Sequence, residues 1–335
     1  TLSQAGMVNV YFGPLNALDG LSEPDAEVWG PHGNAYFGRN LGPLGDFNGD
    51  GVDDILAGGL SIKNVVGKSV GAAYLLLGPL DEGDAIDGAS SGTVDLIIYG
   101  EEEYDRFGVA MTAMGDWTGD GLPDIVISAQ DGSAGKGALY GFESDRVLEE
   151  GGAFWSASDA DIIVDGLGNS SRTGEALRVT DDLDGDGYVE LLVGAPRRNL
   201  DGTQRGVAYL VSSLASGGIA SICDAEFRGQ TDNAHFGAAV AGWGASSTMG
   251  DAGIAVGAPD AGSGTVYVFN EPFEGSIEQS AAVGVVRGGA TGDAFGSSLL
   301  GDIDYDGEGL ADLVVGAPGA ESAKGRVYVL LGGAL

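Results

Sequence analysis

Short apolar runs bounded by glycine recur along the whole chain. Five of them share one form, at residues 54–59, 124–129, 190–195, 253–258 and 312–317, where the sequence reads DILAGG, DIVISA, ELLVGA, GIAVGA and DLVVGA. Runs of this length that are rich in β-branched residues predict buried strands rather than helices.

Two further kinds of apolar run follow these strands. The first kind reads GAAYLLLG (71–78), GALYGF (137–142), GVAYLV (206–211), GTVYVF (264–269) and GRVYVLLG (325–332). The second kind reads VDLIIYG (94–100), ADIIVDG (160–166), DAEFRG (224–229) and GVVRG (284–288). No helical periodicity separates them, which excludes parallel βαβ units. The pattern predicts an all-β fold, a β-propeller of four-stranded antiparallel blades.

Each repeat, which we call a frame, begins with a turn-like pair. These pairs are Phe37-Gly38, Phe107-Gly108, Thr173-Gly174, Phe236-Gly237 and Phe295-Gly296. The strand after the pair, together with the three runs above, gives four strands per frame. We therefore expect one domain over residues 1–335, with frames starting near 37, 107, 173, 236 and 295.

The two ends of the chain do not complete a whole number of blades. GMVNVYFGPL (6–15) aligns with residues 71–80, so the chain opens on a third strand and AEVWG (26–30) is the fourth strand of a partial blade over 1–36. The predicted strands total 21, which fills neither five nor six four-stranded blades. We expect either a piece of a larger chain or a five-bladed ring whose surplus N-terminal strand pairs with another molecule.

An acidic loop of nine residues follows the first strand in four frames, at 46–54, 116–124, 182–190 and 304–312. Each begins nine positions after the first residue of the turn-like pair. The frame that begins at Phe236 has Ala245, Ser247, Met249 and Gly253 at the corresponding places. The frame is therefore structural, and the acidic loop is an addition to it.

The spacing of oxygen-bearing residues in these loops predicts four calcium sites. Positions one, three, five and nine supply Asp46, Asn48, Asp50 and Asp54; Asp116, Thr118, Asp120 and Asp124; Asp182, Asp184, Asp186 and Glu190; and Asp304, Asp306, Glu308 and Asp312. Position seven would add the backbone carbonyls of Val52, Leu122, Tyr188 and Leu310. Calcium takes six to eight oxygens from such alternating positions, and the glycine at position six permits the sharp turn.

The pattern of the loops also suggests three other interpretations. A helical calcium hand requires glutamate at position twelve, where this chain has Ala57, Ile127, Val193 and Val315, so that motif is excluded. Plain hairpin turns remain open, above all at 116–124, where Thr118 replaces a carboxylate or amide. An earlier register starting at Asp302 also remains open for the last loop.

Composition and charge limit the classes of partner. The chain has 335 residues, 62 glycines, one cysteine and a net charge of −35. This charge excludes nucleic acid and anionic membranes as default partners, and no apolar run approaches the roughly 20 residues that span a bilayer. The single cysteine excludes an internal disulfide framework.

No catalytic group stands out. The two histidines, His32 and His235, lie beside Phe-Gly turns, where a turn or core role is expected. Coordination would use the carboxylates of each acidic loop, which leaves no open metal position and no general base. We therefore expect structural cations and no enzyme activity.

Phe-Gly, an acidic loop and Gly-Ala-Pro (194–196, 257–259, 316–318) resemble the FG-GAP repeat of integrin α-subunit β-propellers. The first two frames depart from it, with Gly58-Gly59-Leu60 and Ser128-Ala129-Gln130 in place of Gly-Ala-Pro. The resemblance implies seven blades and a secreted or cell-surface, calcium-stabilised module that binds a protein partner, mediates adhesion or self-assembles. Alternatives are a carbohydrate-binding propeller and an accessory domain of an extracellular enzyme. The expected contact loops are 14–27, 60–70, 79–93 and 143–160.

Overall fold

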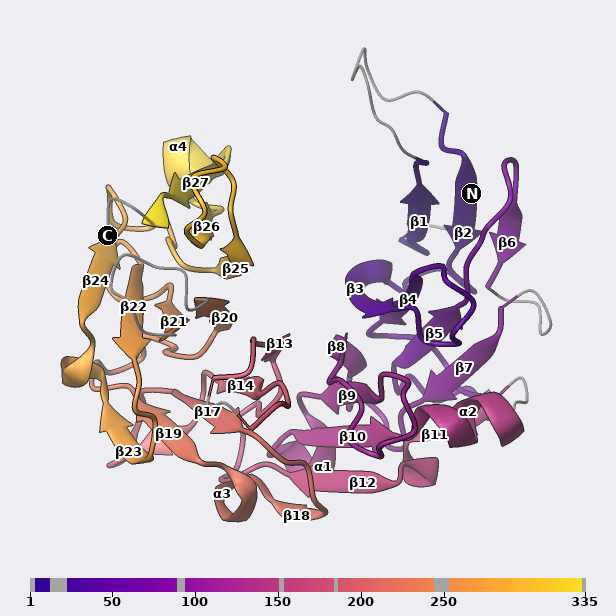
Figure 1. Ribbon diagram of the computed structural model, residues 1–335, viewed down its shortest axis with the longest axis horizontal. Helices are drawn as coiled ribbons and strands as arrows, with labels where there is room; N and C mark the ends of the chain where they lie inside the picture. The colour runs from indigo at the N-terminus through magenta and orange to yellow at the C-terminus, as the bar shows by residue number, and fades with distance from the viewer. Residues whose placement is uncertain are drawn as a thin grey trace. The chain divides into compact units, whose positions relative to one another are not determined.

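The computed structural model describes residues 4–12, 23–88, 94–150, 154–183, 186–243 and 253–332. The chain folds into two compact units (Figure 1). Unit 1 comprises residues 1–132 and 140–161, and unit 2 comprises residues 133–139 and 162–335. The single domain expected from the sequence stays a prediction.

Unit 1 consists of sheets built from successive frames, in which strands of the same frame pair antiparallel. Its strands are β1 (Met7–Val10), β2 (Ala26–Trp29), β3 (Phe37–Gly45), β4 (Asp54–Gly59), β5 (Ala72–Leu76), β6 (Ala85–Asp87), β7 (Leu96–Tyr99), β8 (Phe107–Ala113), β9 (Ile125–Ala129), β10 (Ala138–Phe142, which begins in unit 2) and β11 (Phe154–Ser156). Within this unit the neighbouring strands follow the orders β1-β2-β6, β3-β4-β5-β7-β11 and β8-β9-β10, and the last of these is part of a five-stranded sheet. Each frame thus places its strands side by side in chain order.

Unit 2 repeats this arrangement. Its strands are β12 (Ile162–Asp165), β13 (Ala176–Val179), β14 (Leu191–Ala195), β15 (Asn199–Leu200), β16 (Thr203–Gln204), β17 (Val207–Val211), β18 (Gly217–Gly218), β19 (Ala225–Arg228), β20 (Ala239–Trp243), β21 (Gly253–Ala258), β22 (Thr265–Asn270), β23 (Gly275–Glu278), β24 (Gly284–Arg287), β25 (Ser298–Ile303), β26 (Asp312–Ala317) and β27 (Arg326–Leu330). The sheet orders are β13-β14-β17-β19-β23, β20-β21-β22-β24 and β25-β26-β27. All 21 predicted strands are present, so the predicted all-β class is confirmed.

A contact between two aromatic residues recurs in four of the five frames. The phenylalanine of the Phe-Gly pair contacts the tyrosine of the third strand, at 4.9 Å between ring centroids for Phe37 and Tyr74. The same contact joins Phe107 to Tyr140, Phe236 to Tyr267 and Phe295 to Tyr328, at 5.5, 5.7 and 5.3 Å. Three of these four pairs are edge-to-face and the pair of Phe236 and Tyr267 is tilted. Aromatic pairs in such arrangements stabilise a core beyond the area that they bury.

Glycine in the Gly-Ala-Pro segment permits the close approach of consecutive sheets in unit 2. A Cβ atom at Gly257 would lie 2.2 Å from the carbonyl oxygen of Gly296, and one at Gly194 would lie 2.1 Å from that of Gly237. Any larger residue would therefore push the next frame away.

Several sheets carry an additional outer-edge strand that the sequence pattern does not predict. β6, β11, β18 and β23 each pair in parallel with the outer strand of the preceding frame, namely β2, β7, β12 and β19. These strands have two to four residues and no alternating pattern, as in AID and FWS. The sequence therefore carried no signal for them, and a hairpin of β15 and β16 was missed for the same reason.

Two of the expected contact loops contain regular structure that the sequence pattern does not predict, and their role in contacts stays a prediction. β6 lies within 79–93, while 143–160 contains the helix α2 (Ser144–Glu150), β11 and the 3-10 turn η1 (Ala157–Asp159). The helix has only two turns, with Val147 buried, which is too short to show a helical period. The remaining helical turns are α1 (Gly132–Gly135), α3 (Ile219–Ile222), η2 (Gln279–Ala281) and α4 (Ala320–Ala323). No helix in the described part of the chain is long and apolar enough to cross a membrane.

Candidate metal centres

The first aspartate of each acidic loop is bound by the backbone of its own loop. In loop 46–54 the N–H of Gly51 donates to Asp46 at 2.9 Å. The equivalent bonds run from Gly121 to Asp116, Gly187 to Asp182 and Gly309 to Asp304, at 2.7, 2.9 and 2.9 Å. These glycines have φ of 90°, 95°, 95° and 85°, a region that favours glycine, so the predicted turn at position six is confirmed.

The acid at position nine is the buried member of each loop. Asp54, Asp124, Glu190 and Asp312 are each at most 1% exposed. One oxygen of each accepts the backbone N–H of position two, from Phe47, Trp117, Leu183 and Tyr305, at 2.7–2.9 Å. The acid therefore closes the loop on itself at the start of the second strand.

The same acid also ties the loop to the end of the third strand in three frames. The N–H groups of Gly78, Ser144 and Gly332 donate to the second oxygen of Asp54, Asp124 and Asp312, at 2.7, 2.9 and 2.8 Å. Sequence spacing could not reveal these donors, because they lie 20–24 residues away in the chain. Position nine is thus a link between two strands as well as a predicted ligand.

The side chains at position five bind the backbone of position seven in three loops. Asp50 accepts from Val52, Asp120 from Leu122 and Asp186 from Tyr188, at 2.9, 2.8 and 2.8 Å. In the last loop this position is Glu308, whose own N–H donates to Asp306 at 3.1 Å. The carbonyls of Val52, Leu122, Tyr188 and Leu310 remain predicted ligands.

Two loops bring their carboxylates close together. One oxygen each of Asp182, Asp186 and Glu190 lies within 4.8 Å of the others, and the same holds for Asp304, Asp306 and Asp312. Such sets offer only oxygen, which hard divalent cations prefer, and each set carries three negative charges. These residues fit a cation. Asp184 and the segment 244–252 of the frame that begins at Phe236 lie outside the described residues.

Loop 46–54 fits a cation for a different reason. Asp46 has one carboxylate oxygen, Oδ1, that is closed to solvent and accepts no hydrogen bond from the described residues. The side chain of its neighbour Asn48 accepts the backbone N–H of Asp50 and donates its amide to the Asp50 carboxylate, both at 3.0 Å. A buried carboxylate oxygen without a donor is costly unless a cation binds it.

In loop 116–124 the first aspartate accepts several hydrogen bonds from the loop itself. Asp116 accepts the N–H groups of Gly119, Asp120 and Gly121 at 2.6–3.1 Å, and also the Thr118 hydroxyl at 3.2 Å. These bonds outweigh desolvation and lower the pKa of Asp116. Thr118 therefore acts inside the loop as a hydrogen-bond donor to a carboxylate.

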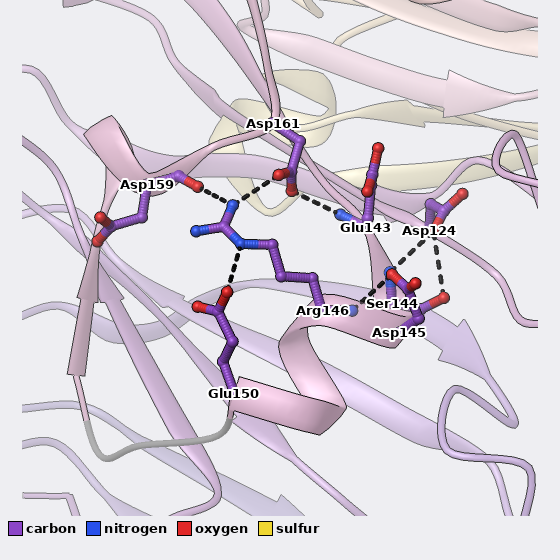
Figure 2. A network of polar contacts seen from close by, with 8 residues as sticks. All are labelled: Asp124, Glu143, Ser144, Asp145, Arg146, Glu150, Asp159 and Asp161. Carbon is purple, nitrogen blue, oxygen red and sulfur yellow. Dashed lines mark hydrogen bonds and ion pairs between the residues drawn. The ribbon is translucent and has the colours of Figure 1, made fainter.

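Ser144, which sequence reasoning did not single out, supplies further donors to this loop. Its N–H and its hydroxyl both donate to Asp124, at 2.9 and 3.1 Å (Figure 2). The same hydroxyl lies 3.2 Å from Asp120, so its one proton is shared between the two carboxylates. Burial raises the pKa of Asp124, and the bonds from Ser144 and Trp117 oppose that rise. Two carboxylates of the predicted site are thus held by the start of α2.

The residues at position two differ in their surroundings. Phe47 and Leu183 are buried. Tyr305, at the same position of the last loop, is 70% exposed. The two histidines make local contacts, His32 with the N–H of Lys63 and His235 with Asp260.

A family model described as "FG-GAP repeat" matches residues 173–211 and 295–330. The chain carries FG-GAP repeats of the integrin α-subunit type. Its sheets are therefore blades of a β-propeller. The two matched frames are the ones in which three carboxylates converge.

Curated relatives match longer stretches of the FG-GAP chain. Integrin alpha-5 of Xenopus laevis is 31% identical over 196 residues, 56% of this chain and 17% of its own length. Integrin alpha-PS2 of Drosophila melanogaster is 35% identical over 170 residues, 48% of this chain and 11% of its own. Phosphatidylinositol-glycan-specific phospholipase D of Dictyostelium discoideum is 28% identical over 241 residues, 66% of this chain and 25% of its own.

These FG-GAP matches cover a quarter or less of each of the three relatives. A solved structure of BBS1N in complex with ARL6DN, soaked with lead, aligns with 86% of this chain and 65% of its own at a TM-score of 0.43 and 9% identity, too low to inform the fold.

Proposed function

We propose that this chain is a calcium-stabilised propeller that serves outside the cell as a protein-binding module of the adhesion type. The observation that carries the proposal is the convergence of three carboxylates in each of the two frames that match the FG-GAP model. The similarity to integrin α subunits supports the binding role.

The cations would be held by the acidic loops and would act structurally. Loops 182–190 and 304–312 would hold calcium through their converging carboxylates, and loop 46–54 through Asp46, Asn48 and Asp50. Calcium would neutralise the repulsion between these groups and stiffen the connection between the first two strands. The acid at position nine would transmit that stiffness to the third strand through its backbone donors.

Calcium binding favours a location outside the cell. Extracellular calcium modules commonly bind at roughly 10⁻⁴–10⁻³ M, a concentration that the cytosol does not supply. The net charge of −35 would also be partly neutralised by bound calcium. We therefore place the module in the secreted or cell-surface class.

A second candidate rests on the phospholipase relative. Its match spans 66% of this chain, so an FG-GAP propeller of this kind could serve as an accessory domain of an extracellular enzyme. A carbohydrate-binding propeller is the third candidate. Self-assembly is the alternative to a separate protein partner.

Binding of the fluorescently labelled chain to intact cells tests these candidates. We expect binding in millimolar calcium that is lost in EDTA and lost after trypsin treatment of the cell surface. Binding that survives trypsin but disappears after glycosidase treatment would favour the carbohydrate candidate. An absence of binding, with a strictly monomeric chain in light scattering, would contradict the proposed role.

A further inference from the structure

A pocket of about 540 Å³ in unit 1 lies outside the acidic loops. Its walls come from the end of β7, from β11 and from the loop around Val65 and Val66. This volume lies in the range of about 300–1,000 Å³ that is usual for small-ligand sites. Two of the loops expected to make contacts, 60–70 and 143–160, supply its lining.

Aromatic side chains form one surface of this pocket. Tyr99 and Phe154 lie 6.0 Å apart between ring centroids, with 34° between their planes. Phe154 is 46% exposed although it is a large apolar side chain, and Val65 and Val66 beside it are 82% and 74% exposed. Such exposed apolar surface offers a platform for the apolar face of a ligand.

Polar groups suited to hydroxyl recognition surround the rings. Asn64, Glu101, Ser156 and Asp159 line the pocket, and none of its described lining residues is basic. Planar carboxylates accept hydrogen bonds from hydroxyl groups, while an amide can donate as well as accept. The neighbouring acids Glu102 and Glu103 would repel an anionic ligand.

The wall of the pocket is fixed by a network centred on Arg146 of α2. Its guanidinium donates to the carbonyl of Asp159 and to the carboxylate of Asp161, both at 2.6 Å, and to Glu150 at 3.1 Å (Figure 2). It also lies 4.8 Å over the ring of Trp155. One cation therefore already neutralises this side of the pocket, which disfavours a second cation as ligand.

We propose that this pocket binds a neutral saccharide, whose C–H face packs on Phe154 and Tyr99 while its hydroxyls bond to Asn64, Glu101 and Asp159. A sugar ring combines an apolar face with a rim of hydroxyl groups, which matches the combination of lining residues. This site adds a saccharide subsite to the protein-binding module and does not depend on it.

Saturation-transfer NMR with a panel of neutral methyl glycosides tests the site directly. The panel contains glucosides, galactosides, mannosides and N-acetylglucosaminides, and the chain is kept in calcium. We expect at least one glycoside to bind with millimolar affinity. Phe154→Ala should weaken this binding about fivefold, which is equivalent to the loss of about 1 kcal/mol expected for an aromatic contact. Glu101→Gln should also weaken it.

Tyr104→Ala is the matched control, because Tyr104 is 68% exposed and is not among the lining residues. It should leave binding unchanged. Thermal unfolding of each variant separates loss of binding from loss of fold. Phe154 and Glu101 are both exposed, so we expect the two binding-site variants to fold. The proposal is overturned if no glycoside binds, if Phe154→Ala binds as the wild type does, or if N-acetyl-arginine amide binds this pocket in place of the glycosides.

Discussion

Loops 116–124 and 304–312 have nearly the same pattern of acids, yet the structure stabilises them differently. In the second of them, Asp304, Asp306 and Asp312 converge, and the N–H of Gly332 at the end of the third strand donates to Asp312. In the first, the corresponding donor is Ser144, whose hydroxyl proton is also shared between two carboxylates. We therefore expect that hydrogen-bond donors from the protein can take the place of a cation in a loop of this kind.

The comparison ranks three of the four predicted cation sites. Loops 182–190 and 304–312 carry preformed carboxylate sets, while the carboxylates of loop 116–124 are already engaged by backbone and hydroxyl donors. A cation would have to displace those donors there. We therefore expect the weakest calcium affinity at loop 116–124 and the strongest at loops 182–190 and 304–312.

Removal of calcium should have the largest effect on stability. A site filled at 100 times its dissociation constant contributes about 2.7 kcal/mol, so two filled sites contribute about 5 kcal/mol. Urea unfolding in calcium and in EDTA measures this difference. An unchanged midpoint in EDTA would mean that hydrogen bonds alone stabilise all four loops.

Asp312→Ala should destabilise the chain nearly as much. The carboxylate is 1% exposed and accepts the N–H groups of Tyr305 and Gly332, which would both lose their acceptor. We expect a loss of about 3–5 kcal/mol in urea unfolding that is present in EDTA and becomes larger in calcium, because Asp312 is also a predicted ligand.

Asp306→Ala is the control for Asp312→Ala within the same loop, because Asp306 is exposed. It should lower the stability in calcium only. If both variants lost stability only in calcium, position nine would be a ligand without a role as a link between strands.

Ser144→Ala should reveal the substitution of hydrogen bonds for a cation. The variant loses the hydroxyl bonds to Asp120 and Asp124, which should cost about 1–3 kcal/mol in EDTA. In calcium the loss should shrink, because the freed carboxylates can bind a cation. Ser212→Ala, at the end of β17, should show no such calcium dependence, and equal losses in both buffers for Ser144→Ala would oppose this account.

Thr118→Asp should have the smallest effect on stability and should make loop 116–124 resemble its counterparts. A fourth carboxylate adds attraction for the cation and repulsion in its absence. Isothermal titration should show calcium affinity at this loop raised about tenfold, equivalent to about 1.4 kcal/mol. Unaltered affinity would show that the donors from Ser144 alone decide the difference.

Much of the fold followed from the sequence because one pattern is repeated. Phe-Gly, the strand before Gly-Ala-Pro and the Gly-x-x-Tyr strand are local signals that recur at fixed spacing, so their strands were placed correctly. The edge strands were not, since segments such as AID and Gly217–Gly218 form strands only by pairing with a preceding frame. Tertiary context decides such short segments.

The acidic loops were also located correctly, but their individual differences were not foreseen. The turn at position six depends on glycine within the loop and is readable from the sequence. The contribution of Ser144 is not, because this residue lies 20 positions beyond Asp124 and reaches it only after β10 returns beside β9. Long-range donors of this kind determine how much a loop needs its cation.

The number of calcium ions bound per chain tests the account most directly. We expect equilibrium dialysis to show two tight sites in the wild type, one of which is lost in Asp182→Ala and one in Asp304→Ala, while Asp116→Ala retains both. Loss of a tight site in Asp116→Ala, or no bound calcium at millimolar concentration, would contradict it.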